Sequence, residues 1–376
     1  MDTQKAKELL HKYSMNTCTS EEKAYVETWF LKALDEAKAD SLSPDYLKKE
    51  KEIYSRLPKA PGLKRQKLWP LATAASIILV VIASLYYTDF KFDKSEQNIL
   101  AAGDLPAGKN GATLTLSSGK RIILSDAANG ELIKESGVSI VKTASGELIY
   151  KITGGANGPI QFNTLTTAKG QQYQILLPDG TSAWLNAASS LRFPLTFSGL
   201  NERMVVLEGE AFFSVKHNNR QPFRVLTKGQ MVEDIGTQFN VNSYEEEQFT
   251  KTTLIEGSAS VSSQFPGQKV TKIVLNPGQQ AVLTSMGQLQ VNKVDTIEAI
   301  AWKNGVFVFN NESIESIMRK ISRWYNVEVR YQGEASTEEF SGAISRSKSI
   351  VQVLKMLEYS KSVHFKIEER RITVMP

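Results

Sequence analysis

The pattern of hydrophobic and polar residues divides the chain into three parts. Residues 68–88 form an uninterrupted uncharged run, LWPLATAASIILVVIASLYYT. Before it, apolar residues recur at spacings of three and four, which predicts helices. After residue 112 they alternate with polar residues, which predicts strands. Gly62 is the only glycine before residue 89, and the many later glycines are typical of turns that join strands.

The uncharged run predicts one transmembrane helix. At ~1.5 Å per residue it extends over ~31 Å, which matches the hydrocarbon core of a bilayer. Trp69 lies near one end and Tyr86 and Tyr87 near the other, as in the aromatic belts of membrane proteins. A buried core helix is the alternative, although such helices rarely run this long without a charge. A cleaved signal peptide is disfavoured because the run begins at residue 68.

The charges beside the run predict its orientation. The basic residues of 58–67, a segment without acidic residues, are Lys59, Lys64, Arg65 and Lys67. Residues 89–96 carry more acidic than basic side chains. Because Lys and Arg stay in the cytoplasm, we expect a cytoplasmic N-terminus and an exported C-terminal body. Much of the net charge of +5 thus belongs to residues 58–67, a basic membrane flank, and does not indicate a nucleic-acid-binding face.

Residues 1–57 predict a small all-α head. Helices are expected over 3–14 and 20–38, with a third that opens at Ser43, and Thr19 with Glu22 fits a capping box. The apolar candidates for a partner-binding face are Leu9, Leu10, Tyr13, Tyr25, Val26, Trp29 and Phe30, of which Tyr25, Trp29 and Phe30 are expected to be exposed or half-exposed. So short a head has a marginal core. These side chains therefore either complete that core or are buried on a partner, and both remain open. The single cysteine, Cys18, excludes an internal disulfide.

The exported body is expected to begin with a linker over 89–111 and to continue as a β-rich domain over 112–295. The expected strand-forming segments are 112–124, 173–185, 203–215, 223–226, 238–242, 252–261 and 273–283. No helix longer than about ten residues is expected between 100 and 300. Thr113–Gly130 and Tyr173–Ser190 resemble each other: each predicts a strand, a two-residue turn, a strand and a corner of small residues. This is a hairpin or one turn of a solenoid, used twice.

Residues 302–376 predict a separate α/β domain with the order β-α-β-β-α-β-β. Its strands are expected at Val306–Phe309, Val327–Tyr331, Phe340–Ile344, Val363–Ile367 and Arg371–Met375. Asn311 is the expected N-cap of the first helix, and Ser349 that of the second. This order is typical of helices packed on one sheet.

No constellation for catalysis or metal binding is evident. The histidines His11, His217 and His364 are far apart in sequence. His217 is expected in a polar turn, and His364 on a strand. No nucleophile elbow, phosphate loop or dinucleotide fingerprint is present. We therefore expect no enzyme, no cofactor and no metal; an exported hydrolase would need a cleft with a perturbed acid or base.

Several carboxylates are close in sequence, but their positions favour structural roles. Glu208 with Glu210 and Glu233 with Asp234 flank turns or lie in strands. The run Glu245–Glu247 is expected to be a solvated loop.

Three stretches of the chain resemble the FecR family of transmembrane anti-sigma factors. The core of the resemblance is 167–261, which includes GTQFNV and LEGEAFF. Its landmarks are Asp179, Gly180, Asn186, Pro194, Gly209, Gly236, Asn240 and Gly257. As turn and strand residues, they are expected to specify the fold rather than contacts. The segment that ends at Trp29 resembles the family's sigma-binding segment, and 307–374 is similar to the secretin/TonB short N-terminal (STN) fold.

The resemblance implies a single-pass inner-membrane protein with a cytoplasmic N-terminus and a periplasmic C-terminus. The head would bind an extracytoplasmic-function (ECF) sigma factor. The body, a solenoid- or sandwich-like β domain followed by the STN-like domain, would receive a signal from the signalling domain of an outer-membrane TonB-dependent transporter. Envelope proteases would then release the head. A free sheet edge of the terminal domain is the expected recognition surface. The alternative is a membrane-tethered β-rich envelope scaffold without a sigma partner.

Overall fold

The computed structural model describes residues 104–376, except 136–137, 145, 153–158, 235, 266–269, 334–336 and 361. The predicted head, the predicted span at 68–88 and the first part of the predicted linker lie outside the described residues. The same holds for the candidate sigma-binding residues Leu9, Leu10, Tyr13, Tyr25, Val26, Trp29 and Phe30. In the described part, no helix has the length and apolar character needed to cross a membrane.

The first domain is built of strands, as the alternating pattern predicts. Its first strands are β1 (Lys109–Asn110), β2 (Thr113–Thr115), β3 (Arg121–Ile123), β4 (Gly130–Glu135), β5 (Val138–Lys142), β6 (Leu148–Ile152), β7 (Phe162–Thr167), β8 (Gln171–Leu176), β9 (Ser182–Leu185) and β10 (Ser189–Pro194). The remaining strands are β11 (Arg203–Ser214), β12 (Phe223–Thr227), β13 (Gln230–Asp234), β14 (Gln238–Ser243), β15 (Phe249–Glu256), β16 (Ala259–Ser263), β17 (Lys272–Leu275), β18 (Gln279–Thr284) and β19 (Leu289–Lys293). Between 104 and 300 the described helix is α5 (Thr296–Ile300).

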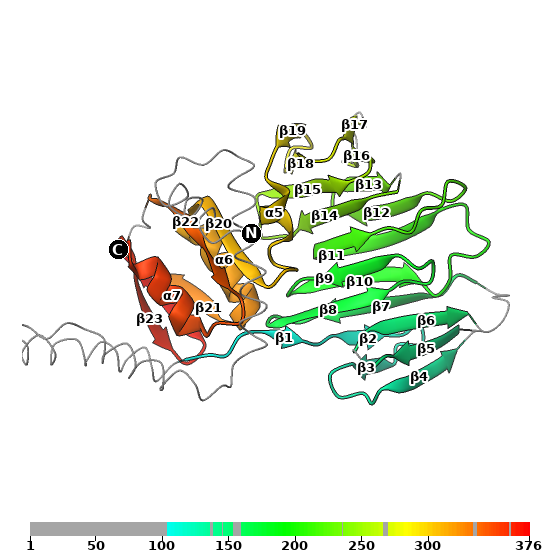
Figure 1. Ribbon diagram of the computed structural model, residues 1–376, viewed down its shortest axis with the longest axis horizontal. Helices are drawn as coiled ribbons and strands as arrows, with labels where there is room; N and C mark the ends of the chain where they lie inside the picture. The colour runs from blue at the N-terminus through cyan, green and yellow to red at the C-terminus, as the bar shows by residue number, and fades with distance from the viewer. Residues whose placement is uncertain are drawn as a thin grey trace, which may run out of the picture. The chain divides into compact units, whose positions relative to one another are not determined.

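Strand β11 belongs to both layers of this domain (Figure 1). Its first half pairs with β10 and β12, and its second half pairs with β9 and β14. The first layer has the order β3-β2-β7-β10-β11-β12-β13-β16-β17. The second has the order β4-β5-β6-β8-β9-β11-β14-β15-β18-β19. The inward residues of both layers form one apolar core, so the domain is the expected all-β sandwich.

Gly209 lies where β11 passes from one layer to the other. Its φ is +89°, a value that side chains other than glycine rarely adopt. A Cβ atom there would lie 2.5 Å from Ser189 Oγ. The crossing therefore requires glycine, which explains why this position is a landmark of the sequence.

The turns of the two similar segments differ from the prediction. In the first, the Leu116 N–H donates to Lys120 O and the Gly119 N–H to Leu116 O, both at 2.9 Å. In the second, the Leu177 N–H donates to Thr181 O at 2.8 Å and the Gly180 N–H to Leu177 O at 2.9 Å. Both are three-residue loops that end in a left-handed glycine, so the expected two-residue turns are wrong.

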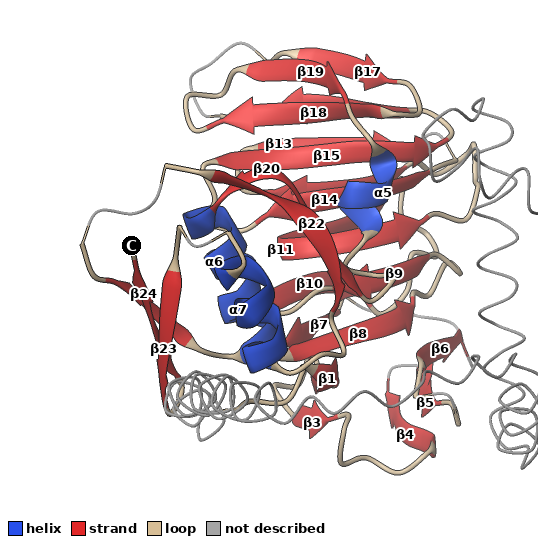
Figure 2. Ribbon diagram, turned by 60° about the vertical axis from the view of Figure 1, so that its left-hand side comes forward, coloured by secondary structure: helices blue, strands red, loops and turns tan. Residues whose placement is uncertain are grey.

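The second domain has the expected element order. It consists of β20 (Val306–Ser313), α6 (Ile314–Tyr325), β21 (Glu328–Tyr331), β22 (Glu339–Ser345), α7 (Ile350–Glu358), β23 (His364–Glu368) and β24 (Arg371–Met375). The expectation of one sheet is wrong, because β20 pairs with β22 while β21 and β23 both pair with β24. Figure 2 shows α6 and α7 as the blue helices beside these strands. Both helices and both sheets contribute to one core.

The helix caps of this domain agree with the sequence at one position and differ at the other. Ser349 caps α7 in a capping box with Gln352, as expected. The cap of α6 is Ser313 and not Asn311. Asn311 has a φ of +48° and lies in an irregularity of β20 between Phe309 and Glu312, which delays the start of the helix by two residues.

Candidate functional site

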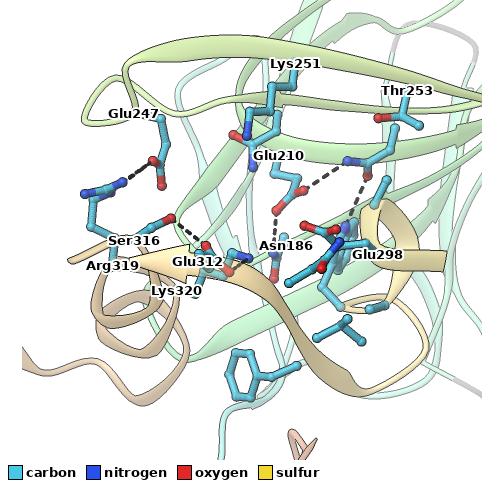
Figure 3. Close-up of a pocket in the computed structure, with 18 of the residues that line it drawn as sticks. Asn186, Glu210, Glu247, Lys251, Thr253, Glu298, Glu312, Ser316, Arg319 and Lys320 are labelled. Carbon is cyan, nitrogen blue, oxygen red and sulfur yellow. Dashed lines mark hydrogen bonds and ion pairs between the residues drawn. The ribbon is translucent and has the colours of Figure 1, made fainter. Parts of the chain in front are cut away.

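The two domains meet at a polar cleft of about 730 Å³ (Figure 3). One wall is formed by β14 and β15 of the β domain, and the other by α5, β20 and α6. Glu210, from the second half of β11, also lines the cleft. We call this contact region the junction and define it by Asn186, Glu210, Asn240, Tyr244, Glu246, Glu247, Trp302, Arg319, Arg323 and Arg346.

Glu210 is only 8% exposed, and two amides hold it. Asn186 Nδ2 donates to one carboxylate oxygen at 2.7 Å, and Asn240 Nδ2 donates to the other at 3.0 Å. Charged hydrogen bonds of this kind compensate for the burial of a carboxylate. Because both oxygens of Glu210 accept from fixed donors, the arrangement suits holding the structure together better than proton transfer.

The same two amides also reach the second domain. Trp302 Nε1 donates to Asn240 Oδ1 at 3.1 Å, and Arg346 Nη2 donates to Asn186 Oδ1 at 3.0 Å. The landmarks Asn186 and Asn240 therefore make contacts between the two domains of the chain, in addition to their places in the β domain. No local signal in the sequence indicates this, since Asn186 and Arg346 are 160 positions apart.

Arg346 is buried at the junction without a direct carboxylate partner in the described residues. Its exposed fraction is 3%. Besides Asn186, its guanidinium donates to Trp302 O at 2.8 Å and lies 3.7 Å from the ring centroid of Trp324. Its Nε has no hydrogen-bond partner there. Burial lowers the pKa of Arg346 to about 10, and the charge of Glu210 opposes that shift.

A second cluster joins α6 to the loop after β14. Arg323 forms ion pairs with Glu246 at 2.7 Å and with Glu247 at 3.0 Å, and its guanidinium lies 3.9 Å from the ring centroid of Tyr244. Arg319, one helical turn earlier, reaches the other oxygen of Glu247 at 2.9 Å. Glu246 and Glu247 thus bind across the domains. The expected solvated loop is wrong for Glu247, which is 17% exposed, whereas Glu246 remains 50% exposed. The four-residue spacing of the two arginines on one helix face was the signal available in the sequence.

The protonation states of this cluster follow from its surroundings. Burial alone would raise the pKa of Glu247, but the hydrogen bond from Arg319 and the charge of Arg323 outweigh it and lower the pKa below its usual value. Burial raises the pKa of Tyr244 well above its usual range. The Tyr244 hydroxyl is therefore neutral and donates to Ala187 O at 2.6 Å.

The other landmarks remain within the β domain. Asp179 forms a buried ion pair of 2.7 Å with Arg203, which connects the turn of Gly180 to β11. Pro194 ends β10. A Cβ on Gly236 would lie 2.5 Å from His217 Nδ1, and one on Gly257 would collide with the backbone of Gly236.

The other acidic and histidine side chains considered as candidates are paired with basic residues, packed against the backbone or exposed. Glu233 binds Arg224 and Lys272. His217 lies against Gly236, and His364 is exposed on β23. Across the described ranges, no group of three or more His, Cys, Asp or Glu side chains is arranged to hold a metal ion.

Comparisons with known proteins agree with this two-domain division. The FecR protein family matches residues 163–260, and the family of FecR C-terminal domains matches 306–374. Two crystal structures of a proposed anti-sigma factor from Parabacteroides distasonis ATCC 8503, at 2.50 and 1.65 Å resolution, are each 30% identical to this chain. Their TM-scores are 0.51 and 0.50; the matches cover 57% and 56% of this chain and 98% and 97% of theirs. No curated protein matches the chain.

Proposed function

The chain belongs to the FecR family of anti-sigma factors, and from this premise we propose that it is a single-pass regulator of the inner membrane. Its cytoplasmic head, residues 1–57, binds an ECF sigma factor. Its periplasmic body receives a signal from the signalling domain of an outer-membrane TonB-dependent transporter. Regulated proteolysis then releases the head together with the sigma factor.

The observation that carries the proposal is the family membership, which rests on matches to both described domains, at 163–260 and 306–374. The uncharged run at 68–88 and its basic flank support a membrane position with the head in the cytoplasm. An anti-sigma factor acts by binding, and the carboxylates of the junction are engaged in structural contacts, which is consistent with such a role.

Within this proposal, the edge of β22 is the part of the terminal domain best suited to a transporter domain. In the described part of the chain, β22 pairs with β20 alone. Ser341, Gly342 and Ala343 are exposed on it, so small side chains leave its backbone accessible. A partner strand could add to such an edge through main-chain hydrogen bonds. We also propose that this terminal domain is STN-like.

The proposal is tested by recovery of a sigma factor with the tagged full-length chain from detergent-solubilised membranes. The wild-type chain should recover one ECF sigma factor. Trp29→Ala should reduce that recovery by about tenfold or more, since a buried aromatic anchor contributes ~2 kcal/mol or more at an interface. Glu27→Ala, two positions away and therefore on the other side of the expected helix, is the matched control and should recover the normal amount.

Two results would contradict the proposal. If the wild-type chain recovers no sigma factor, the envelope scaffold becomes the better explanation. If Trp29→Ala and Glu27→Ala recover equal amounts, the predicted face of the head is not the binding surface. Circular dichroism of the variants establishes that the helices of the head are intact.

A further inference from the structure

Residues 104–111 connect the side of the predicted membrane span to the folded body, and they are docked on both domains. We call them the strap. The sequence predicts a linker over 89–111, yet this last part of it is held at both of its ends. At ~3.3 Å per residue the strap can extend over ~26 Å, long enough to touch two domains in turn.

The first half of the strap lies on the C-terminal domain. The Ile350 N–H, at the start of α7, donates to Leu105 O at 3.0 Å, and the Val351 N–H donates to Asp104 Oδ1 at 3.3 Å. The side chains of Leu105 and Ala107 pack against the core of that domain. The chain that arrives from the membrane side therefore meets the C-terminal domain before the β domain.

Gly108 lies directly under the ring of Trp324 in α6. A Cβ at this position would lie 2.7 Å from Trp324 Cε3, which is closer than real Cβ atoms approach other atoms. Gly108 does not have the left-handed φ that excludes other residues. The tryptophan ring, and not backbone strain, is thus what demands glycine here.

The second half of the strap is a strand of the β domain. The Lys109 N–H donates to Gly170 O at 2.9 Å, and the Gly111 N–H donates to Gln172 O at 3.0 Å. Lys109–Asn110 forms β1 and pairs in parallel with β8. Figure 1 shows β1 between the C-terminal domain and β2.

Gly170 joins the strap to the junction. Its carbonyl accepts from Lys109, and its N–H donates to Arg323 O at 2.7 Å. The side chain of Arg323 is the one that binds Glu246 and Glu247 from the β domain. A movement of α6 away from the β domain would therefore break the Gly170–Arg323 bond and pull at the strap through Leu105 and Gly108.

We propose that the C-terminal domain uses this strap to hold the membrane-proximal end of the body, and that separation of the two domains frees residues 104–111 for proteolysis. The inference rests on the proposed function for its biological purpose. The docking itself is independent of the sigma factor. A signal at the C-terminal domain would reach the membrane side through a segment of eight residues, without a rearrangement of the β sandwich.

Release of the strap can be measured by trypsin digestion, because trypsin cleaves after Lys109 within it. Cleavage after Lys109 requires the segment to leave β8, so its rate reports local release. All variants are full-length chains in detergent with Cys18→Ser. Cleavage after Arg203, which is buried in the β domain, reports general unfolding in the same digest.

We expect Gly108→Ala to raise the cleavage rate after Lys109 by about fivefold or more, because the added methyl group displaces the strap from Trp324. Ser198→Ala is the control: Ser198 is exposed in a turn of the β domain and belongs to neither the strap, the junction nor β22, so its rate should equal that of the wild type. Equal rates for the two variants would overturn the docking of the strap.

The coupling between domain separation and release of the strap is tested with Arg323→Ala. This variant removes the ion pairs to Glu246 and Glu247 but no contact of the strap itself. We expect faster cleavage after Lys109. A triple variant adds Leu105→Cys and Ile350→Cys to Arg323→Ala. Oxidation to the disulfide should restore slow cleavage after Lys109, and reduction should abolish that protection. An unchanged rate in Arg323→Ala, or a disulfide that fails to slow cleavage, would overturn the proposal.

The two proposals fail in distinguishable ways. Sigma-factor recovery from undigested samples tests the head, whereas the digest tests the strap. Loss of recovery with a normal pattern of strap cleavage would leave the strap inference intact. Normal recovery without coupled cleavage would overturn the strap and leave the anti-sigma function intact.

Discussion

Two buried arginines show how differently the interior of the β domain and the junction hold a charge. Arg203, 1% exposed, pairs directly with the carboxylate of Asp179 at 2.7 Å, and its Nε donates to Gln221 O at 2.8 Å. Arg346, 3% exposed, is held by neutral oxygens and the ring of Trp324. The Arg203–Asp179 pair lies entirely within the β domain and holds that domain together.

The second arrangement suits a contact that must open. When the two domains separate, water can replace the carbonyl and amide oxygens that bind Arg346, so the cost of opening is moderate. An interface with such polar contacts is typical of domains that move relative to each other. A buried ion pair, by contrast, strongly resists the loss of one partner. The comparison therefore indicates that the Arg346 contact opens at a lower cost than the Arg203 pair, whereas Arg323, whose side chain is 6% exposed and paired with Glu246 and Glu247, opposes separation at the junction.

The largest expected effect is that of Arg203→Met. It leaves Asp179 buried without its counter-ion and should reduce the free energy of unfolding of the β domain by ~3–5 kcal/mol, measured by urea denaturation. The double variant Asp179→Leu with Arg203→Met should regain most of that loss, since apolar residues of similar size can replace a buried pair. A loss below ~1 kcal/mol would mean that the pair behaves as a surface pair and would remove the basis of the comparison.

Arg346→Met should have a smaller effect, a loss of ~1–2 kcal/mol. The variant removes the Arg346 hydrogen bonds to Asn186 Oδ1 and Trp302 O, but these oxygens keep the N–H donors of Ala187 and Gly305. It also removes a cation whose burial is costly, as its pKa of about 10 indicates. Hydrogen exchange should show faster opening of α5 and the segment around Trp302, with the core strand β11 unchanged. A loss as large as that of Arg203→Met would show that the junction is as permanent as the sandwich.

Acidification should weaken the junction below about pH 4.5. The pKa of Glu247 is lower in the folded protein than its ordinary value of 4.5. Its contribution is therefore complete above that ordinary value and is lost as the pH falls through the folded pKa. Hydrogen exchange of α6, measured from about pH 6 to about pH 3, should show this loss of protection in the wild type. In Glu247→Gln the protection of α6 should depend less on pH. Identical profiles would show that the carboxylate does not stabilise the junction.

Local patterns predicted much of the fold but not the junction. Alternation identified strands such as β12, whose residues are buried and half-buried in turn, because side chains of a strand point to opposite faces. The caps of α6 and α7 could be expected near their sequence positions for the same local reason. The strands β4, β5 and β6 were missed, since GELIKE in β4 mixes charges into its apolar positions.

The contacts of the junction depend on tertiary structure, which no local pattern contains. Asn186 is indistinguishable in sequence from any turn asparagine, and its partner Arg346 comes from another domain. The run Glu245–Glu247 illustrates the same limit within three residues: identical side chains have different partners, because only Glu246 and Glu247 face α6. The strap was likewise expected as a linker, since nothing in its own residues shows that Trp324 covers Gly108.

The smallest expected effect comes from Glu245, the most exposed residue of that run and one that matches the solvated-loop prediction. It pairs with Lys228 at 2.7 Å, but the two side chains are 84% and 82% exposed. Such a pair is screened by water and salt and contributes little. Glu245→Gln should therefore leave urea denaturation, hydrogen exchange of α6 and cleavage after Lys109 unchanged, whereas Glu247→Gln should accelerate exchange of α6 at pH 6 (about this value). If the two variants behaved alike, net negative charge near α6 would matter more than the specific geometry at Arg319 and Arg323, and the junction would have to be reinterpreted as a diffuse electrostatic contact.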